Sequence, residues 1–230
     1  MTAHSQPQSV SIDVAVDVVC PWCFLGKRRL DEALAERPDI PVDIRWRPFQ
    51  LDPTVPVEGV DQHDYLVAKF GDPRRLEDAH ARLVALGQDV GIDYRFDLVE
   101  RYPNTLDAHR LIRWASEVGR QREVVERLFV THFTEGGYIG DHDVLAAIGA
   151  EVGLDFDETL SRLASDVDRT AIQREIQDLQ RMGITGVPCF ILAGKWAVVG
   201  AQPTGVLVDA IGQVAEQLGL GSRDAVADAR

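Results

Sequence analysis

The chain has 230 residues, of which 45% are hydrophobic, and it carries a formal net charge of −13. This hydrophobic content is enough for the core of one large or two small domains, and the acidic balance excludes nucleic acids and anionic membranes as partners. The sequence shows no basic-then-apolar leader, no apolar stretch long enough to span a bilayer and only three cysteines, so we expect a cytoplasmic protein.

The first predicted elements meet at a pair of cysteines. Residues 11–19 are rich in β-branched residues and mostly alternate, which predicts a strand, and residues 24–36 carry apolar side chains at helical spacing. Cys20-Pro21-Trp22-Cys23 stands between them, so we expect Cys20 as the helix N-cap and Pro21 at the first helical position. The free N–H groups and the helix dipole would then favour the Cys20 thiolate. This arrangement predicts a redox site.

Three other interpretations of the cysteine pair have to be weighed. A structural zinc or iron–sulfur site needs about four nitrogen or sulfur ligands, but Cys189 is the only further cysteine and no histidine has a matching spacing. A structural disulfide across so short a loop would gain little loop-closure entropy. Two ordinary buried thiols would explain neither Pro21 nor the strand-to-helix position. We therefore expect no metal and a pair that exchanges disulfides.

Almost the whole middle of the chain predicts helices, with ends indicated by capping residues and glycines. The expected helices are residues 64–70, ending at Gly71; residues 75–86, ending at Gly87; one capped by Asn104 and ending at Gly119; residues 123–133; one capped by Asp141 and ending at Gly153; one beginning at Asp157; and residues 169–181.

The last predicted elements follow a proline. Gly186-Val187-Pro188 leads into the apolar residues 189–192, which predicts a loop and then a strand. Gly194-Lys195 turns the chain into a second strand at residues 196–199, and Pro203 opens a helix that ends near Gly219. We expect a hairpin followed by a C-terminal helix.

The order of the predicted elements resembles the thioredoxin fold. A strand, a Cys-x-x-Cys turn and a helix come early in the chain, and a proline, two strands and a helix come late. With the long helical segment between them, the chain resembles the DsbA family, an α/β, thioredoxin-like fold with an inserted all-helical domain. Residues 17–23, 104–110, 186–188 and 200–203 look most like the FrnE-like dithiol–disulfide oxidoreductases, and the resemblance covers about residues 10 to 219.

The resemblance implies how the chain divides. Residues 10–60 and 182–220 are expected to form a discontinuous thioredoxin-like domain, and residues 61–181 an inserted helical domain over the active site. Residues 1–9 and 221–230 are expected to be disordered tails.

The two cysteines are expected to have different roles. Cys20, nearer solvent, forms the mixed disulfide with the substrate, and Cys23 in the first helical turn resolves it. Trp22 adds apolar surface beside the sulfur but no positive charge, and Lys27 stands too far along the helix for direct pairing. Asp17 either accepts or relays a proton during resolution or only closes the strand with a backbone hydrogen bond, and both interpretations stay open.

The resemblance also implies a cis-proline loop at Val187-Pro188 that packs against the cysteine pair. The Val187 backbone would then pair with an extended substrate segment, whereas the alternative is a trans proline that only begins an edge strand. His109 is either a substrate-binding residue or a core or rim histidine, which is the commoner case. Cys189 is expected to be buried and redox-silent, because a free cysteine in an apolar run usually acts as a small hydrophobe.

We therefore expect a DsbA-like protein dithiol–disulfide oxidoreductase without a bound cofactor, since the cysteine pair carries the electrons. Its partners would be thiol- or disulfide-containing proteins or small molecules, with glutathione or another low-molecular-weight thiol open as a co-substrate. One alternative is a kappa-type glutathione transferase or 2-hydroxychromene-2-carboxylate isomerase-like enzyme of the same fold, which carries Ser in place of Cys20. Another is a holdase-like, polypeptide-binding module. The sequence determines neither the direction of exchange nor the oligomeric state.

Overall fold

The computed structural model describes residues 9–220, so residues 1–8 and 221–230 of the two predicted tails lie outside the described residues. Its centre is a four-stranded mixed sheet with the strand order β2-β1-β5-β6. The strands are β1 (Val10–Val16), β2 (Val42–Pro48), β5 (Cys189–Leu192) and β6 (Trp196–Val199). β1 runs parallel to β2 and antiparallel to β5, and β5 and β6 form the predicted antiparallel hairpin.

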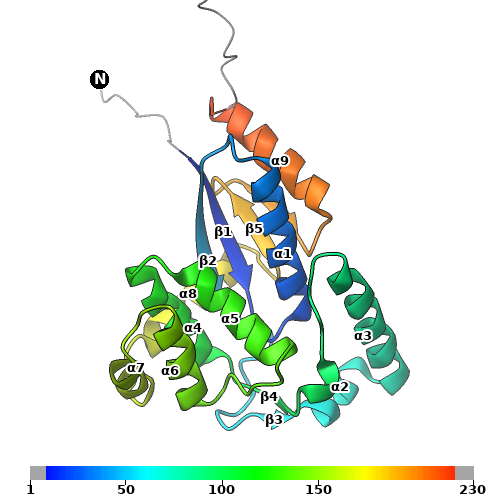
Figure 1. Ribbon diagram of the computed structural model, residues 1–230, viewed down its shortest axis with the longest axis vertical. Helices are drawn as coiled ribbons and strands as arrows, with labels where there is room; N and C mark the ends of the chain where they lie inside the picture. Colours follow the sequence, from blue (N-terminus) through cyan, green and yellow to red (C-terminus); the bar gives the residue numbers. More distant parts are fainter. Residues whose placement is uncertain (1–8, 221–230) are drawn as a thin grey trace, which may run out of the picture.

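Two helices, α1 (Pro21–Glu36) and α9 (Thr204–Gln217), pack against each other in front of the sheet (Figure 1). The other helices gather around the lower part of the sheet, where β1 ends and α1 begins. They are α2 (Gln62–Phe70), α3 (Pro73–Gln88), the 3-10 helix η1 (Phe96–Leu98), α4 (Leu106–Glu117), α5 (Gln121–Phe133), α6 (His142–Glu151), α7 (Phe156–Leu163) and α8 (Arg169–Arg181). None of the described helices has the length and apolarity to cross a bilayer.

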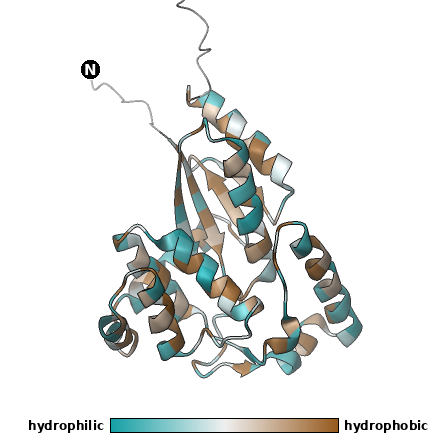
Figure 2. Ribbon diagram, viewed as in Figure 1, coloured by the Kyte–Doolittle hydropathy of each residue, from teal (hydrophilic) through white to brown (hydrophobic). Residues whose placement is uncertain are grey.

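The two faces of the sheet carry separate apolar layers, because successive side chains of a strand point to opposite faces. On β5, Phe190 packs beneath α1, where a β-carbon on Gly26 would lie 3.2 Å from its ring. Its neighbour Cys189 packs instead with Leu179 of α8. In Figure 2, β1 and β5 are largely brown, or hydrophobic, whereas β2 and the surrounding helices have mixed colours.

One apolar cluster joins the sheet to the inserted helices. It runs from Val14 of β1 to Trp114 of α4 and Phe129 of α5. A short ribbon of β3 (Val60–Asp61) and β4 (Arg101–Tyr102) stands near the expected start of the helical domain. The packing continues across the predicted borders, so the division into residues 10–60 with 182–220 and residues 61–181 stays a prediction.

The structure confirms the α/β, thioredoxin-like fold with several inserted helices, but two predicted element ends are wrong. The first strand ends at Val16 and not at residue 19, because the chain turns at Asp17, whose backbone carbonyl accepts the N–H of Cys20 at 3.0 Å. Gly87 does not end α3, which continues to residue 88. Glycine is required there for another reason, since a β-carbon would lie 2.7 Å from the ring of Tyr94.

Two predicted helix starts are displaced by one residue. Helix α7 begins at Phe156, one residue before the predicted Asp157, and its N-cap is Asp155, whose side chain accepts the N–H of Glu158. Helix α4 has Thr105 at its N-cap position, although the predicted Asn104 side chain still accepts the N–H of the first helical residue at 3.0 Å.

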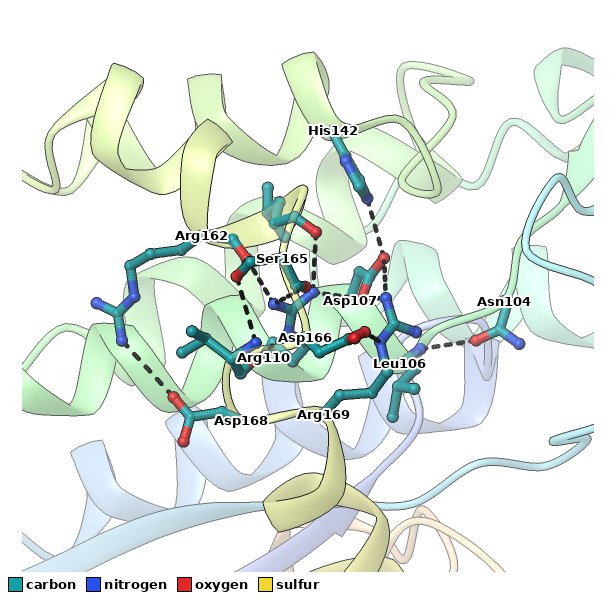
Figure 3. Close-up of polar contacts among 12 residues, drawn as sticks. Asn104, Leu106, Asp107, Arg110, His142, Arg162, Ser165, Asp166, Asp168 and Arg169 are labelled. Carbon is teal, nitrogen blue, oxygen red and sulfur yellow. Dashed lines mark hydrogen bonds and ion pairs between the residues drawn. The ribbon is translucent and has the colours of Figure 1, made fainter.

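A buried arginine organises the turn between α7 and α8 (Figure 3). Arg110 on α4 has no exposed surface, and its guanidinium donates to the Asp107 carboxylate at 2.8 Å. It also donates to four backbone carbonyls of the turn, those of Arg162, Leu163, Ser165 and Val167. His142 and Arg169 contact the same Asp107 carboxylate. A guanidinium has five N–H donors, so these contacts satisfy the whole buried cation.

Candidate active site

The cysteine pair lies between β1 and α1. Cys20 is the N-cap of α1 with extended backbone angles (φ −93°, ψ 109°), and Pro21 occupies the first helical turn. The N–H of Cys23 donates to the Cys20 carbonyl at 2.9 Å. Both cysteines are free thiols, and Cys20 is 5% exposed whereas Cys23 is fully buried. The more accessible sulfur is therefore the one at the N-terminus of the helix.

Burial separates the chemistry of these two thiols. It raises the pKa of Cys23 well above its usual range, and a hydrogen bond with the Cys20 thiol adds to this rise. A backbone hydrogen bond from Asp17 acts in the opposite direction. Cys23 therefore holds its proton at neutral pH until a neighbouring group accepts it, which suits a resolving thiol.

The proline loop faces the accessible thiol. The Val187–Pro188 peptide bond is cis, and the Cys20 Sγ donates a hydrogen bond to the carbonyl oxygen of Val187 at 3.8 Å. Buried Pro188 packs against α1 at Gly26, where a β-carbon would lie only 2.9 Å from Pro188 Cγ. Because glycine permits this approach, α1 and the loop hold the Cys20 sulfur and the Val187 backbone next to each other.

Asp17 lies in the turn before the cysteines and is 1% exposed. Its Oδ2 accepts the N–H of Leu51 at 2.7 Å, and its backbone carbonyl makes the hydrogen bond to Cys20. Its Oδ1 is buried and has no hydrogen-bond partner in the part of the chain that the structure describes. The strand-closing hydrogen bond is present, and the carboxylate also has an unoccupied acceptor, so both predicted interpretations of Asp17 remain compatible with the geometry.

His109 lies on the buried side of α4 and is 2% exposed. Its Nε2 is 2.9 Å from the carbonyl oxygen of Phe49 and 3.6 Å from Asp17 Oδ1. The ring borders a cavity at the edge strand β2 and is absent from the lining of the apolar cavity beside Cys20. These contacts are those of a core histidine, and its predicted role in substrate binding stays a prediction.

An apolar cavity of about 170 Å³ lies beside Cys20. Helices α2 and α3 form much of its wall, and its lining includes Trp22, Leu66, Leu76, Leu83, Phe96 and Tyr102. The Arg82 guanidinium lies 5.5 Å from the centre of the Trp22 ring. A space of this kind can accept an apolar group of a substrate bound at the Cys20 sulfur.

Tyr94 belongs to the site but is absent from the predicted residues. Its hydroxyl donates a hydrogen bond to the Pro21 carbonyl at 2.6 Å, and its ring stacks on Phe96 at 5.0 Å between centroids. Burial raises the pKa of Tyr94, and negative charge on the two cysteines would raise it further, so the hydroxyl stays protonated. No local pattern marks Tyr94, because it reaches the cysteines only through the fold.

Lys27 and Cys189 stand apart from this chemistry. Lys27 is buried in ion pairs with Asp31 at 2.7 Å and Glu126 at 2.6 Å, in line with the expectation that it does not pair with Cys20. Cys189 is buried on the α8 side of the sheet, and this burial raises its pKa. Its redox silence stays a prediction. Within residues 9–220, no group of three or more His, Cys, Asp or Glu side chains is placed to hold a metal ion.

Three comparisons place the chain among known proteins. Residues 11–212 match the family described as DSBA-like thioredoxin domain. The uncharacterized protein YwbO of Bacillus subtilis (strain 168) is 31% identical over 207 residues, which cover 88% of this chain and 96% of YwbO. The structure of the probable DsbA oxidoreductase SCO1869 from Streptomyces coelicolor is 28% identical, with a TM-score of 0.82 over 96% of this chain and 94% of that one. A structure of 2-hydroxychromene-2-carboxylate isomerase, 16% identical, shares the fold with a TM-score of 0.70 over 92% of this chain and 100% of that one.

Proposed function

The chain belongs to the DSBA-like thioredoxin domain family, and we propose that it is a thiol–disulfide oxidoreductase acting through Cys20 and Cys23. One observation carries the proposal: the Cys20 sulfur, at the N-terminus of α1, faces the Val187 carbonyl of the proline loop at 3.8 Å. Two cysteines with a purely structural role would not require a second backbone segment, here that of Val187, next to the Cys20 sulfur. The two cysteines carry the electron pair, so the proposed reaction needs no bound cofactor.

In the proposed reaction, the Cys20 thiolate attacks a substrate disulfide, bonds to one sulfur and releases the other as a thiolate. Cys23 then attacks the Cys20 sulfur, so that the bond to the substrate breaks and the Cys20–Cys23 disulfide forms. The substrate gains two electrons and the cysteine pair loses them. The reverse sequence oxidises a substrate dithiol, and the redox potential of the pair sets the direction.

Asp17 and Val187 support these steps. Cys23 is buried and protonated, so its attack needs a proton acceptor, and Asp17 offers a buried carboxylate oxygen without a hydrogen bond among residues 9–220. The Val187 carbonyl can pair with an extended substrate segment by strand addition once the Cys20 thiol hydrogen has left. Pro188 packs against α1 and so holds the Val187 backbone in place.

The apolar cavity beside Trp22 favours substrates that carry an apolar group near the reacting sulfur. Both proteins and small molecules meet this requirement, and glutathione or another low-molecular-weight thiol is the proposed co-substrate. Within the family we place the chain among the FrnE-like members in the cytoplasm. Its resemblance in residues 17–23 and 186–188 and its use of only three cysteines support this placement.

The intact cysteine pair argues against the same-fold alternatives. Kappa-type glutathione transferases and 2-hydroxychromene-2-carboxylate isomerases carry Ser in place of Cys20, and their reactions need no second cysteine. A holdase-like module would bind polypeptides without using either thiol. Exchange activity therefore separates these candidates from the proposed oxidoreductase.

Turnover assays test the proposal. The protein should accelerate the reduction of insulin by dithiothreitol or of a small disulfide by glutathione. Cys20→Ser should abolish this activity, and Cys189→Ala, at a buried site on the other side of the sheet, should retain it. A folded protein that turns over neither substrate would refute the proposed function, and a redox titration against glutathione would give the direction.

A further inference from the structure

Asp17 uses only one of its two buried carboxylate oxygens. Oδ2 accepts the N–H of Leu51 at 2.7 Å, whereas Oδ1 has no hydrogen-bond partner within the described residues. A buried anionic oxygen without a hydrogen-bond donor is unfavourable. A protonated Asp17 could not accept the proton of Cys23. The site therefore needs a group that stabilises the anion.

His109 is placed to be that group. The Phe49 carbonyl, 2.9 Å from His109 Nε2, can only accept a hydrogen bond, so Nε2 carries the hydrogen. The same nitrogen lies 3.6 Å from Asp17 Oδ1. Within residues 9–220, His109 is the only Lys, Arg or His with a nitrogen within 4.0 Å of this carboxylate.

The other ionisable groups near Asp17 supply no positive charge. Burial lowers the pKa of His132 on α5 to about 4, so this ring is neutral at pH 7. Burial raises the pKa of Tyr102 on β4 and of Cys23 on α1, so both stay protonated. Cys20 can add only negative charge.

The opposite side of His109 offers no free cation either. There the ring borders a cavity of about 720 Å³, whose charged residues come from β2, α4, α5 and α8. They are Asp43, Arg45, Arg47, Arg113, Glu117, Arg122 and Glu175. Each of these arginines is paired with a carboxylate at 3.6 Å or less. Among the Lys, Arg and His side chains of the described residues, the Nε2–H of His109, which donates to the Phe49 carbonyl, is thus the group that brings positive partial charge within 4.0 Å of the free oxygen of Asp17.

We propose that His109 is a positioning residue for disulfide exchange: its Nε2–H donates to the Phe49 carbonyl, and the positive end of this N–H dipole, 3.6 Å away between heavy atoms, stabilises the anionic Asp17 Oδ1 electrostatically, so that this oxygen can accept the Cys23 proton. The inference deepens the proposed function and rests on it. In the resolving step, the bond between the Cys23 and Cys20 sulfurs forms as the Cys20–substrate bond breaks. The substrate sulfur leaves as a thiolate, and the proton of Cys23 passes to Asp17.

A coloured aromatic disulfide separates the two chemical steps in one experiment. Attack by Cys20 releases one coloured thiolate, and resolution by Cys23 releases the second. A Cys189→Ala background restricts the reaction to these two cysteines. The rate of the second release should rise with pH as the proton acceptor becomes ionised, and its midpoint is the quantity to compare among variants.

Two substitutions of His109 form a matched pair. His109→Gln places an amide N–H near the position of Nε2 and should keep the wild-type midpoint. His109→Asn places its amide one bond short and should raise the midpoint by about one pH unit, which is about tenfold in rate below the midpoint. The first release should be unchanged in both variants. In an Asp17→Asn background, where the proton acceptor is absent, adding His109→Asn should cause no further decrease in the rate of the second release.

An unshifted midpoint in His109→Asn, an equal shift in both variants, or a further loss in the Asp17→Asn background would overturn the inference. Nitrogen NMR of the unmodified protein tests it without any substitution at His109. We expect the tautomer with hydrogen on Nε2, and a tautomer with hydrogen on Nδ1 would overturn the inference. A protein that releases no thiolate would instead refute the proposed function, so the two failures are distinguishable.

Discussion

Three cysteines with the same side chain lie in three different environments. Cys20 stands at the N-terminus of α1 beside the Val187 carbonyl, Cys23 is fully buried in the first turn, and Cys189 packs with Leu179 on the α8 side of the sheet. Burial raises the pKa of both Cys23 and Cys189. Because a thiol reacts through its accessible thiolate, Cys20 is expected to react first.

This order of reaction can be tested by trapping. Cys23→Ser should accumulate a mixed disulfide between Cys20 and a disulfide-containing protein, because the attacking thiol remains and the resolving thiol is lost. Cys20→Ser should accumulate none, since Cys23 is buried and protonated. Non-reducing electrophoresis followed by mass spectrometry identifies the trapped cysteine. Trapping by Cys20→Ser alone would reverse the two roles.

His132 should make the stability of the protein depend on pH. Burial lowers its pKa to about 4, against about 6.5 in an unfolded chain. Between these values the unfolded state binds a proton that the folded state does not. The free energy of unfolding should therefore decrease as pH falls from about 6.5 to about 4, by up to roughly 1.4 kcal/mol per pH unit.

The matched variant is His132→Phe, which keeps an aromatic ring against Phe133 and removes the titration. Urea unfolding at a series of pH values should give a flatter profile for this variant than for the wild type. Parallel profiles for the two proteins over this range would contradict the assignment to His132.

At the scale of elements, α1 positions the site through a close contact as well as through its N-terminus. A β-carbon on Gly26 would lie 2.9 Å from Pro188 Cγ and 3.2 Å from the Phe190 ring. An ordinary helix interior favours alanine over glycine by about 1 kcal/mol. The glycine is therefore explained by the approach of the proline loop and not by the helix itself.

Gly26→Ala should slow exchange with a small disulfide several-fold. The added carbon forces α1 and Pro188 apart, and the Val187 carbonyl moves away from Cys20 with the loop. Gly205→Ala in α9, where an added carbon meets nothing within 4 Å, is the matched control and should leave the rate unchanged. Full activity in Gly26→Ala would show that this contact does not position the loop.

Many of the elements could be predicted from local signals. Asp141 caps α6 and Pro203 precedes α9 as expected, because caps depend on neighbouring residues. β2 is absent from the predicted elements, although its apolar residues at 42, 44 and 46 alternate with charged residues at 43, 45 and 47, which is the pattern of a half-buried strand. Gly87 gives the local signal of a helix end, but the ring of Tyr94, which lies beyond α3, requires glycine inside the helix.

The same distinction applies to the site. Cys20, Cys23 and Pro188 can be located from their own neighbours in the sequence, and all three lie within residues 11–212, which match the DSBA-like family. The contact between Asp17 and His109 cannot be located in this way. These two residues come from separate segments that meet only in the folded chain.

At the scale of the whole molecule, a charged cluster in the inserted helices is linked to a cysteine of the sheet. Leu179 of α8 belongs to the same buried apolar cluster as Cys189 of β5. The turn that leads into α8 is held by four hydrogen bonds of Arg110 (Figure 3). Loss of Arg110 should therefore weaken the attachment of the helix that shares this cluster with Cys189.

Arg110→Ala leaves the buried Asp107 without one of its cations and should lower the free energy of unfolding by about 3 kcal/mol or more. The effect can be followed at a distance in a Cys20→Ser/Cys23→Ser background, where Cys189 is the only thiol. Labelling of Cys189 requires the structure to open, so its rate should rise roughly 100-fold with Arg110→Ala.

Arg181 on α8 provides the control for this experiment. It is 70% exposed and pairs with Asp178 at 2.9 Å, so Arg181→Ala should change little. The free energy that Arg110→Ala removes can be measured by urea unfolding and by Cys189 labelling. Equal values would mean that the sheet and the inserted helices open as one unit, as the continuous apolar cluster implies. A lower urea midpoint with unchanged labelling would contradict this expectation. It would show that residues 61–181 open separately from the sheet, as an independent domain.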